Sequence, residues 1–296
     1  MRSIAKALTP RISMSNQSQL LWQDPDWLKQ ANEWIQSEAK RQAIHITGTI
    51  EQPHVYPWST VLRVPTDAGT LFFKATAPET VYEAALTQML AAWYTDCMPE
   101  LLGVDTARGW MLMCDGGEPL RASIRPTQDI KPWDSVITRY AELQIGLAEH
   151  VFEILALKIP DYRPAMLPAL FSQLLADEES LMIDQQKGLT SDELRQLQDL
   201  TPRFKQICTD LVSFGIPESL NHGDFHDGNV LLKNGRITFF DWGEASVTHP
   251  FVSLRTFFVS IEISLKLDDY SFTPEMAALL DLYLEPWSNL YQRKHC

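Results

Sequence analysis

The chain has 296 residues, of which 45% are hydrophobic and 21% charged, so it is an ordinary globular protein with room for one large domain or two lobes. Its formal net charge of −13 argues against a nucleic-acid partner, because binding a phosphate backbone requires concentrated Lys and Arg. No long uncharged apolar stretch indicates a membrane span, and the four scattered cysteines, which lack metal-binding spacing, fit a cytoplasmic location.

The first element that the pattern predicts is an amphipathic helix from about Pro25 to Lys40. Trp27, Ala31 and Ile35 fall on one face of this segment at helical spacing. The residues before it, 1–23, contain basic residues and serines but no acid. We expect a flexible arm there, since chain ends are usually poorly tied down, with a transit peptide as the alternative.

A β-rich segment follows this helix. Strands are expected at residues 44–50, 60–64 and 70–74. Gly69 supplies the turn before the third strand, and Lys74 would end that strand. The stretch 51–59 between the first two strands contains no glycine, and Trp58 and Ser59 fall near the tip of this loop.

The next predicted helix, from about Pro78 to Tyr94, has an apolar stripe at helical spacing with Glu83 beside it. A buried-looking strand within Gly109–Gly117 ends in a paired-glycine turn, a pattern expected where a small lobe passes into a larger one. The remainder is mainly helical, with candidates at residues 132–155, 162–177, 190–214 and 273–290. Thr190 and Glu193 match a capping box.

The most informative segment is His222-Gly-Asp-Phe-His-Asp-Gly-Asn229, which is rich in turn formers and therefore predicts a loop. Asp224 and Asn229 lie five residues apart in it. A two-residue hairpin with Asn234-Gly235 at its turn is predicted next, and it would carry Asp241 back toward Asn229. Three oxygen-bearing side chains then converge.

These three side chains suit phosphoryl transfer. Moving a phosphoryl group from a nucleotide requires a carboxylate near the acceptor hydroxyl and hard oxygen ligands for Mg²⁺. Asp224 suits the first role, and Asn229 with Asp241 suits the second. The kinase catalytic-loop template places its metal-binding Asn at the same distance from its Asp. We therefore predict Asp224, Asn229 and Asp241 as catalytic residues, the last two as metal ligands.

The segment from His222 to Trp242 resembles the aminoglycoside phosphotransferase and choline kinase family of small-molecule kinases. Its loop follows the family pattern HGDxHxxN, and Asp241-Trp242 matches a metal-binding Asp that is commonly followed by Trp. The resemblance continues through residues 243–251. Ser253 and Leu254 stand in the region where the family often has an acidic residue that anchors the turn locally.

This resemblance implies an α+β fold of the protein-kinase-like bilobal type. A small N-terminal lobe would have an antiparallel sheet plus one helix, and a larger C-terminal lobe would be mostly α-helical. We expect these lobes to cover residues 24–115 and 116–296.

The resemblance also implies where a nucleotide, ATP or GTP, would bind. Lys74 would hold the α and β phosphates and Glu83 would hold Lys74, with Glu79 as the alternative partner. The other expected nucleotide contacts are Ser59 and the backbone of Met113, Cys114 and Asp115. The reaction would be Mg²⁺-dependent, in-line transfer of the γ-phosphoryl group to a hydroxyl of a small molecule, with Asp224 as the base.

Three alternatives remain at this point. His222, Asp224 and His226 have the composition of a zinc site in a metallohydrolase. A nucleotide-binding protein that has lost catalysis would retain the same nucleotide-binding side chains, and the glycine-free loop is compatible with it. A kinase acting on proteins is the third, although no activation loop or APE segment follows Asp241.

Overall fold

The computed structural model describes residues 21–268 and 271–295 of the chain. These residues form two compact units. The first contains the described chain up to Pro132 together with Asp224–Glu244, and the second contains the rest. Both the loop that follows Gly223 and the strand that carries Lys74 therefore belong to the first unit.

Two expectations about chain organisation are not decided by these units. The flexible arm predicted at residues 1–23 lies, up to residue 20, outside the described residues. The lobe limits predicted at 24–115 and 116–296 stay predictions.

The first unit contains an antiparallel sheet with the strand order β1-β2-β3-β5-β4. Its strands are β1 (Glu51–Val55), β2 (Ser59–Thr66), β3 (Gly69–Thr76), β4 (Leu101–Asp105) and β5 (Trp110–Cys114). β2 and β3 confirm the two strands predicted around Gly69. This glycine has a φ of 109°, a backbone conformation that side chains with a Cβ rarely adopt.

The strand predicted at residues 44–50 is wrong. The segment makes an isolated bridge between Ile46 and Thr66, and the edge strand is β1, which begins beyond it. Its content of Ile and Thr favoured a strand, but the His45 N–H donates to the Asp67 carboxylate at 2.9 Å. Backbone bonds from Thr47 to Pro65 and from Asp67 to His45, both 3.0 Å, flank the bridge, so the segment pairs with the end of β2 too briefly to form a strand, and β1 makes the longer pairing.

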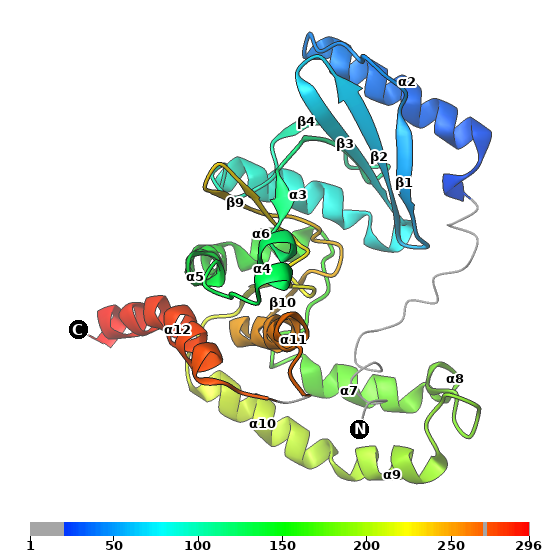
Figure 1. The fold of residues 1–296 in the computed structure, drawn as a ribbon. Helices are drawn as coiled ribbons and strands as arrows, with labels where there is room; N and C mark the ends of the chain where they lie inside the picture. The colour runs from blue at the N-terminus through cyan, green and yellow to red at the C-terminus, as the bar shows by residue number, and fades with distance from the viewer. Residues whose placement is uncertain (1–20, 269–270, 296) are drawn as a thin grey trace. The chain divides into compact units, whose positions relative to one another are not determined.

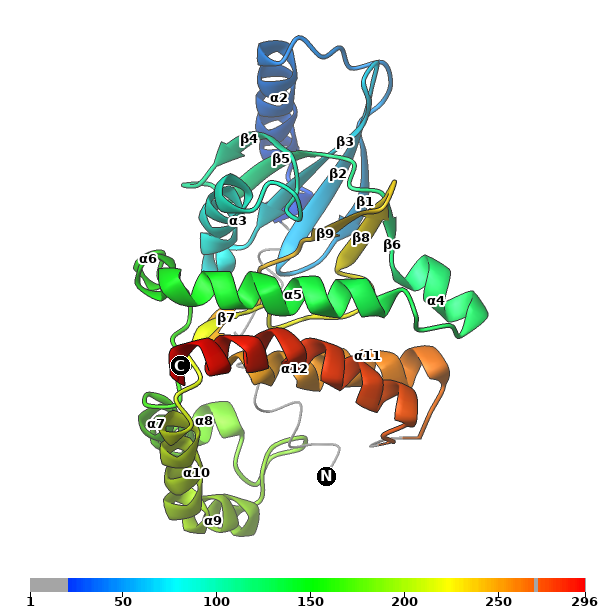
Figure 2. The same ribbon diagram turned by 90° about the vertical axis from the view of Figure 1, so that its left-hand side faces the viewer.

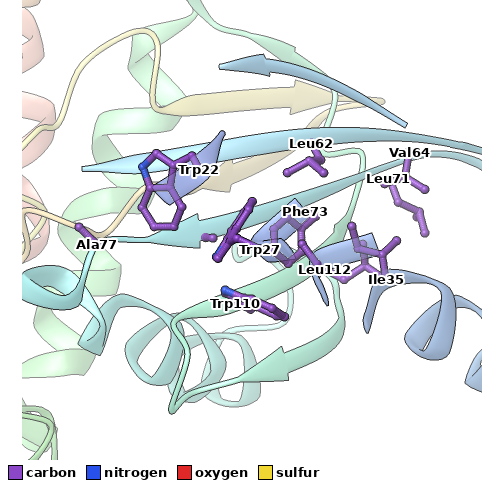
Figure 3. Close-up of a cluster of buried hydrophobic side chains, with 12 residues drawn as sticks. Trp22, Trp27, Ile35, Leu62, Val64, Leu71, Phe73, Ala77, Trp110 and Leu112 are labelled. Carbon is purple, nitrogen blue, oxygen red and sulfur yellow. The ribbon is translucent and has the colours of Figure 1, made fainter. Parts of the chain in front are cut away.

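The helix α2 (Pro25–Arg41) covers one face of this sheet and confirms the predicted amphipathic helix (Figure 1). Asp24 caps it by accepting the Trp27 N–H at 2.9 Å. Figure 3 shows the apolar cluster that α2, the Trp22 side chain and the strands form together. Phe73 on β3 is fully buried in this cluster. Since successive side chains of a strand point to opposite faces, Lys74 is directed to the other face of the sheet.

The helix α3 (Tyr82–Trp93) confirms the helix predicted after β3, from which it is separated by one 3₁₀ turn, η1 (Pro78–Thr80). A further antiparallel sheet in this unit has the order β6-β8-β9. Its strands are β6 (Glu118–Pro119), β8 (Val230–Lys233) and β9 (Arg236–Phe239).

The β8–β9 connection is the hairpin predicted from Asn234-Gly235. Both residues have positive φ, 52° and 81°, as this type of two-residue turn requires. The hairpin ends just before Asp241. A short helix that follows β6 in the chain, α4 (Arg121–Thr127), was not predicted from the sequence.

The second unit is mainly helical, and α12 packs against α5 in it (Figure 2). Its helices are α5 (Trp133–Leu147), η2 (Ala148–His150), α6 (Val151–Ala156), α7 (Leu167–Ala176), α8 (Glu178–Leu181), α9 (Ser191–Asp199), α10 (Thr201–Ser213), η3 (Pro250–Val252), α11 (Ser253–Leu265) and α12 (Pro274–His295). A short antiparallel pair joins β7 (Ser219–Asn221) to β10 (Ser246–Thr248).

The predicted helix at 190–214 is in fact two helices. Its capping box is present, with reciprocal bonds between Thr190 and Glu193. The break after α9 coincides with Pro202 in the first turn of α10, where the missing N–H of proline is tolerated. In the described part of the chain, no helix combines the length and the apolar character needed to cross a bilayer.

Candidate functional site

Three charged side chains meet on the face of the sheet opposite to α2. The Lys74 ammonium lies 2.6 Å from a carboxylate oxygen of Glu83 and 2.6 Å from one of Asp241. Lys74 comes from β3, Glu83 from the first turn of α3, and Asp241 from the chain just after β9. This group is called the ionic cluster below. The predicted ion pair between Lys74 and Glu83 is thereby confirmed.

Burial makes the ionic cluster electrostatically strong. The side chains of Lys74 and Glu83 are only 8% and 2% exposed, whereas that of Asp241 is 46% exposed. Burial alone would lower the pKa of Lys74, but the carboxylates of Asp241 and Glu83 outweigh it and raise that pKa above its ordinary value. Burial also raises the pKa of Glu83, against the opposing effect of the Lys74 charge. The lysine therefore remains charged and fixed in place.

The backbone at Asp241 has an uncommon conformation. Its φ of 66° lies in the left-handed region, which Asp tolerates better than most residues but which still costs free energy. Two contacts hold the chain around it: the Tyr82 hydroxyl donates to the Gly243 carbonyl at 2.7 Å, and the Phe240 N–H donates to the Asn229 carbonyl at 3.3 Å. The second contact joins the end of the hairpin to the preceding loop.

The loop that contains Asp224 forms a second group of polar side chains, the loop cluster of Asp224, His226 and Asn229. The Asn229 amide nitrogen donates to the Asp224 backbone carbonyl at 2.9 Å and to its carboxylate at 3.0 Å. The His226 Nε2 atom lies 3.2 Å from the same carboxylate oxygen, Oδ2. The structure therefore brings together the Asp and the Asn that the motif spacing singled out.

Two arginines of α4 bind Asp227 in the loop that contains Asp224, and the sequence analysis did not identify them. Asp227 is 1% exposed and receives two bonds from the Arg125 guanidinium, at 2.8 and 3.0 Å. The Arg121 Nε atom lies 3.4 Å from Asp227, and the Arg121 N–H donates to the Asp227 carbonyl at 2.9 Å. No spacing rule links Arg125 to a residue 102 positions later, so only the folded chain could show this contact.

A third acidic residue near the site, Glu244, was also missed. Glu244 is exposed to solvent, and its pKa is raised by partial desolvation and by the negative charges of Asp224 and Asp241.

The remaining predicted nucleotide contacts are placed as follows. Ser59 opens β2 directly after a tight turn in which its carbonyl accepts the Tyr56 N–H at 2.9 Å. Trp58 in this turn is half exposed and stacks on Tyr56 with ring centroids 5.1 Å apart, so it is not a buried packing anchor. The predicted loop is thus a hairpin with its turn at this position.

The expected base-reading segment lies at the end of β5. Met113 pairs with both neighbouring strands, and the Cys114 N–H donates to the Glu100 carbonyl at 2.9 Å. The Asp115 carbonyl accepts from Lys233 at 2.8 Å. Contact of this segment or of Ser59 with a nucleotide stays a prediction.

In the second unit, neutral side chains occupy the place where the family often has an anchoring acid. The Ser253 hydroxyl donates to the Asn221 amide oxygen at 2.6 Å and lies 2.9 Å from the Tyr140 hydroxyl. Tyr140 in turn accepts the His222 N–H at 3.1 Å. A buried network without a carboxylate thus anchors the strand that leads into the motif.

Solved structures share this fold at low sequence identity. An ethanolamine kinase from Plasmodium vivax is 14% identical, with a TM-score of 0.58 over 88% of this chain and 74% of that chain. A choline/ethanolamine kinase family protein from Mesorhizobium loti is 15% identical, with a TM-score of 0.52 over 81% and 70%. A macrolide 2'-phosphotransferase from Brachybacterium faecium is 16% identical, with a TM-score of 0.51 over 84% and 81%. No curated protein sequence matches the chain.

The fold is therefore α+β and protein-kinase-like, as the resemblance implied, with an antiparallel-sheet region and a helical remainder. The model of the phosphotransferase enzyme family matches residues 60–256, and the chain belongs to that family. It is a phosphotransferase of that family, so the recognised family and the expected type of enzyme are both confirmed. The metallohydrolase alternative has no ligand set, since no group of three or more His, Cys, Asp or Glu suited to a metal occurs among the described residues.

Proposed function

We propose that this protein transfers the γ-phosphoryl group of ATP or GTP to a hydroxyl of a small molecule, in a Mg²⁺-dependent, in-line reaction with Asp224 as the base. The observation that carries the proposal is the ionic cluster, in which Lys74 bonds to both Glu83 and Asp241. A lysine held in this way on a strand, beside the acidic residue that follows the hairpin, is the arrangement that phosphoryl transfer needs.

The nucleotide is the first reactant to be held. Lys74 is fixed by Glu83 and keeps its charge, so it suits the α and β phosphates of a triphosphate. Ser59 and the backbone from Met113 to Asp115 are the further contacts that we propose for the phosphates and the base. A solved aminoglycoside phosphotransferase of the same fold, with a TM-score of 0.50, is a complex with GDP and kanamycin, which supports a nucleotide as the donor.

The residues present also fit a magnesium ion. Mg²⁺ is commonly held by one or two protein oxygens together with substrate phosphates and water, and Asp241 offers a half-exposed carboxylate. The Asn229 amide nitrogen is bonded to Asp224, so its amide oxygen is the atom that would bind the metal. When bound, the ion would neutralise charge on the phosphates. Asn229 and Asp241 would hold it.

Asp224 suits the acceptor hydroxyl. Its side chain is 41% exposed, so a bound alcohol can reach it, and two donors fix its carboxylate. It would align the hydroxyl and accept its proton as the new phosphate ester bond forms and the bond to the nucleoside diphosphate breaks. Most of the rate would come from positioning and charge neutralisation, for which roughly 7–11 kcal/mol is available from fixing the reactants in geometry.

The direct test is turnover of ATP and GTP with Mg²⁺ against a panel of hydroxylated small molecules. The panel contains the acceptors named for the structural neighbours: choline, ethanolamine, kanamycin and a macrolide. With an accepted substrate, Asp224→Asn should lower turnover by roughly 100- to 10,000-fold, because the substituted amide cannot take the proton. Its thermal melt should match the wild type.

Equal turnover by Asp224→Asn and wild type would refute the role of Asp224. A wild-type protein that binds Mg-nucleotide but turns over none of the panel would favour the non-catalytic alternative instead.

A further inference from the structure

The His226 ring has polar partners on both of its nitrogens. Its Nε2 lies 3.2 Å from the Asp224 carboxylate, and its Nδ1 faces the Gly228 N–H at 2.9 Å and the Arg121 guanidinium at 3.2 Å. A backbone N–H and a guanidinium can only donate. The Nδ1 atom must therefore accept, so the proton of the neutral ring lies on Nε2 and is donated to Asp224.

The position of Arg121 against this ring depends on two neighbours. The Arg121 Nε atom lies 3.4 Å from the buried Asp227 carboxylate. The backbone N–H of Arg121 donates to the backbone carbonyl of Asp227. A Cβ on residue 228 would overlap the Arg121 guanidinium, so the absence of a side chain at Gly228 makes the close approach possible. Arg125 also bonds to Asp227, but no bond from it to His226 is seen.

The tautomer of His226 affects Asp224 at a single carboxylate oxygen. Asp224 Oδ2 receives both the His226 Nε2–H and the Asn229 amide N–H, the latter at 3.0 Å. Two donors on one oxygen fix the rotation of the carboxylate about its Cβ–Cγ bond. The ring is thus the link between the α4 arginine and the carboxylate.

We propose that Arg121 and His226 are positioning residues. Arg121, together with the Gly228 N–H, selects the Nε2–H tautomer of His226, and His226 then orients the Asp224 carboxylate for the acceptor hydroxyl. The effect of Arg121 and His226 on catalysis rests on the proposed function, whereas the assignment of the His226 tautomer does not depend on it.

The tautomer can be measured without any acceptor. Protein labelled with ¹⁵N in its histidine rings is examined by long-range ¹H–¹⁵N NMR at about pH 8.5, well above the ordinary pKa of a histidine ring. The His226 signals are assigned by their absence in His226→Gln. The wild type should show a protonated Nε2 and an unprotonated Nδ1.

Two arginine variants separate the link to the ring from the link to Asp227. Arg121→Gln removes one of the two donors to Nδ1 and should shift the Nδ1 signal of His226, while the Gly228 N–H keeps the ring proton on Nε2. Arg125→Gln, which removes a partner of Asp227 only, should leave that signal near its wild-type position. A wild-type ring with its proton on Nδ1 would overturn the proposal, and equal shifts in the two variants would remove Arg121 from it.

Two substitutions of His226 test the effect on Asp224. In His226→Gln the amide nitrogen can take the place of Nε2–H and donate to Asp224, whereas the shorter side chain in His226→Asn reaches only the position of Nδ1. Turnover is measured with the accepted panel substrate or, failing one, as hydrolysis of Mg-ATP by water.

We expect His226→Asn to lose about 10- to 100-fold in kcat with an unchanged KM for ATP, as is usual for a misplaced group, and His226→Gln to retain most of the wild-type kcat. Equal losses in both variants would refute the donor role of the ring. If the wild type shows no turnover, the proposed function fails, and the NMR measurement still decides the tautomer.

Discussion

The ionic cluster and the loop cluster lie in the same unit but are held together by different physics. In the ionic cluster, Lys74 and Glu83 are almost fully buried and are kept there by opposite charge. In the loop cluster, Asp224 and His226 are 41% and 27% exposed and are held by hydrogen bonds from an imidazole and an amide. Disrupting the ionic cluster should cost much folding free energy, whereas the loop cluster is accessible to a reactant.

The difference suggests a division of labour. A buried charge is tolerated only when its partner is present, so the ionic cluster acts as a rigid part of the fold as well as a candidate phosphate site. Because its side chains are partly exposed, we expect the loop cluster to contribute less to stability, and it can present a carboxylate to solvent. Variants in the first group should therefore be detected in unfolding experiments, and variants in the second mainly in assays of turnover.

The largest effect on stability is expected for Glu83→Ala. It leaves the Lys74 ammonium buried with Asp241 as its remaining partner, which should cost about 3 kcal/mol in the free energy of unfolding. Urea denaturation measures this change. The matched control is Glu79→Ala, because Glu79 is exposed in η1, and its effect should stay within about 0.5 kcal/mol. Similar losses in both variants would mean that the ionic cluster adds nothing to stability.

A much smaller effect, of opposite sign, is expected for Glu244→Gln. The folded-state pKa of Glu244 is raised above its ordinary value of 4.5, so the charged form is less favourable in the folded than in the unfolded chain. Folding therefore loses stability as the pH rises from 4.5 through the raised pKa. The substitution removes this penalty.

Melting temperatures measured from pH 4 to pH 8 test this sign. Glu244→Gln should melt slightly above the wild type at neutral pH, and the difference should vanish below about pH 4.5, where the wild-type carboxyl is protonated in both states. A difference that persists unchanged at pH 4, or a less stable variant at pH 8, would contradict the raised pKa of Glu244.

Local signals explain which parts of the site could be predicted. The spacing of Asp224 and Asn229, the Asn234-Gly235 turn and the stripe beside Glu83 each act over a few residues, and the chain folds accordingly. The pairing of Lys74 with Glu83 was implied by the family resemblance, which left Glu79 as the alternative partner.

The parts that failed depend on distant partners. Residues 44–50 have the composition of a strand, yet they pair with β2 only through the single bridge of Ile46 to Thr66, and Glu51–Val55 makes the longer pairing. Arg121 contacts the His226 ring 105 positions away, and neither residue type nor spacing predicts such a pair. Tertiary contacts of this kind decide geometry without leaving a local pattern.

The most direct test of this division of labour is nucleotide binding with and without Mg²⁺, measured by calorimetry with a non-hydrolysable ATP analogue. Mg²⁺ should strengthen binding equally in the wild type and in Asp224→Asn, while Asp241→Asn, which tolerates the left-handed backbone, should lose this gain. An Asp241→Asn protein that keeps the full effect of Mg²⁺, or an Asp224→Asn protein that loses it, would contradict the account.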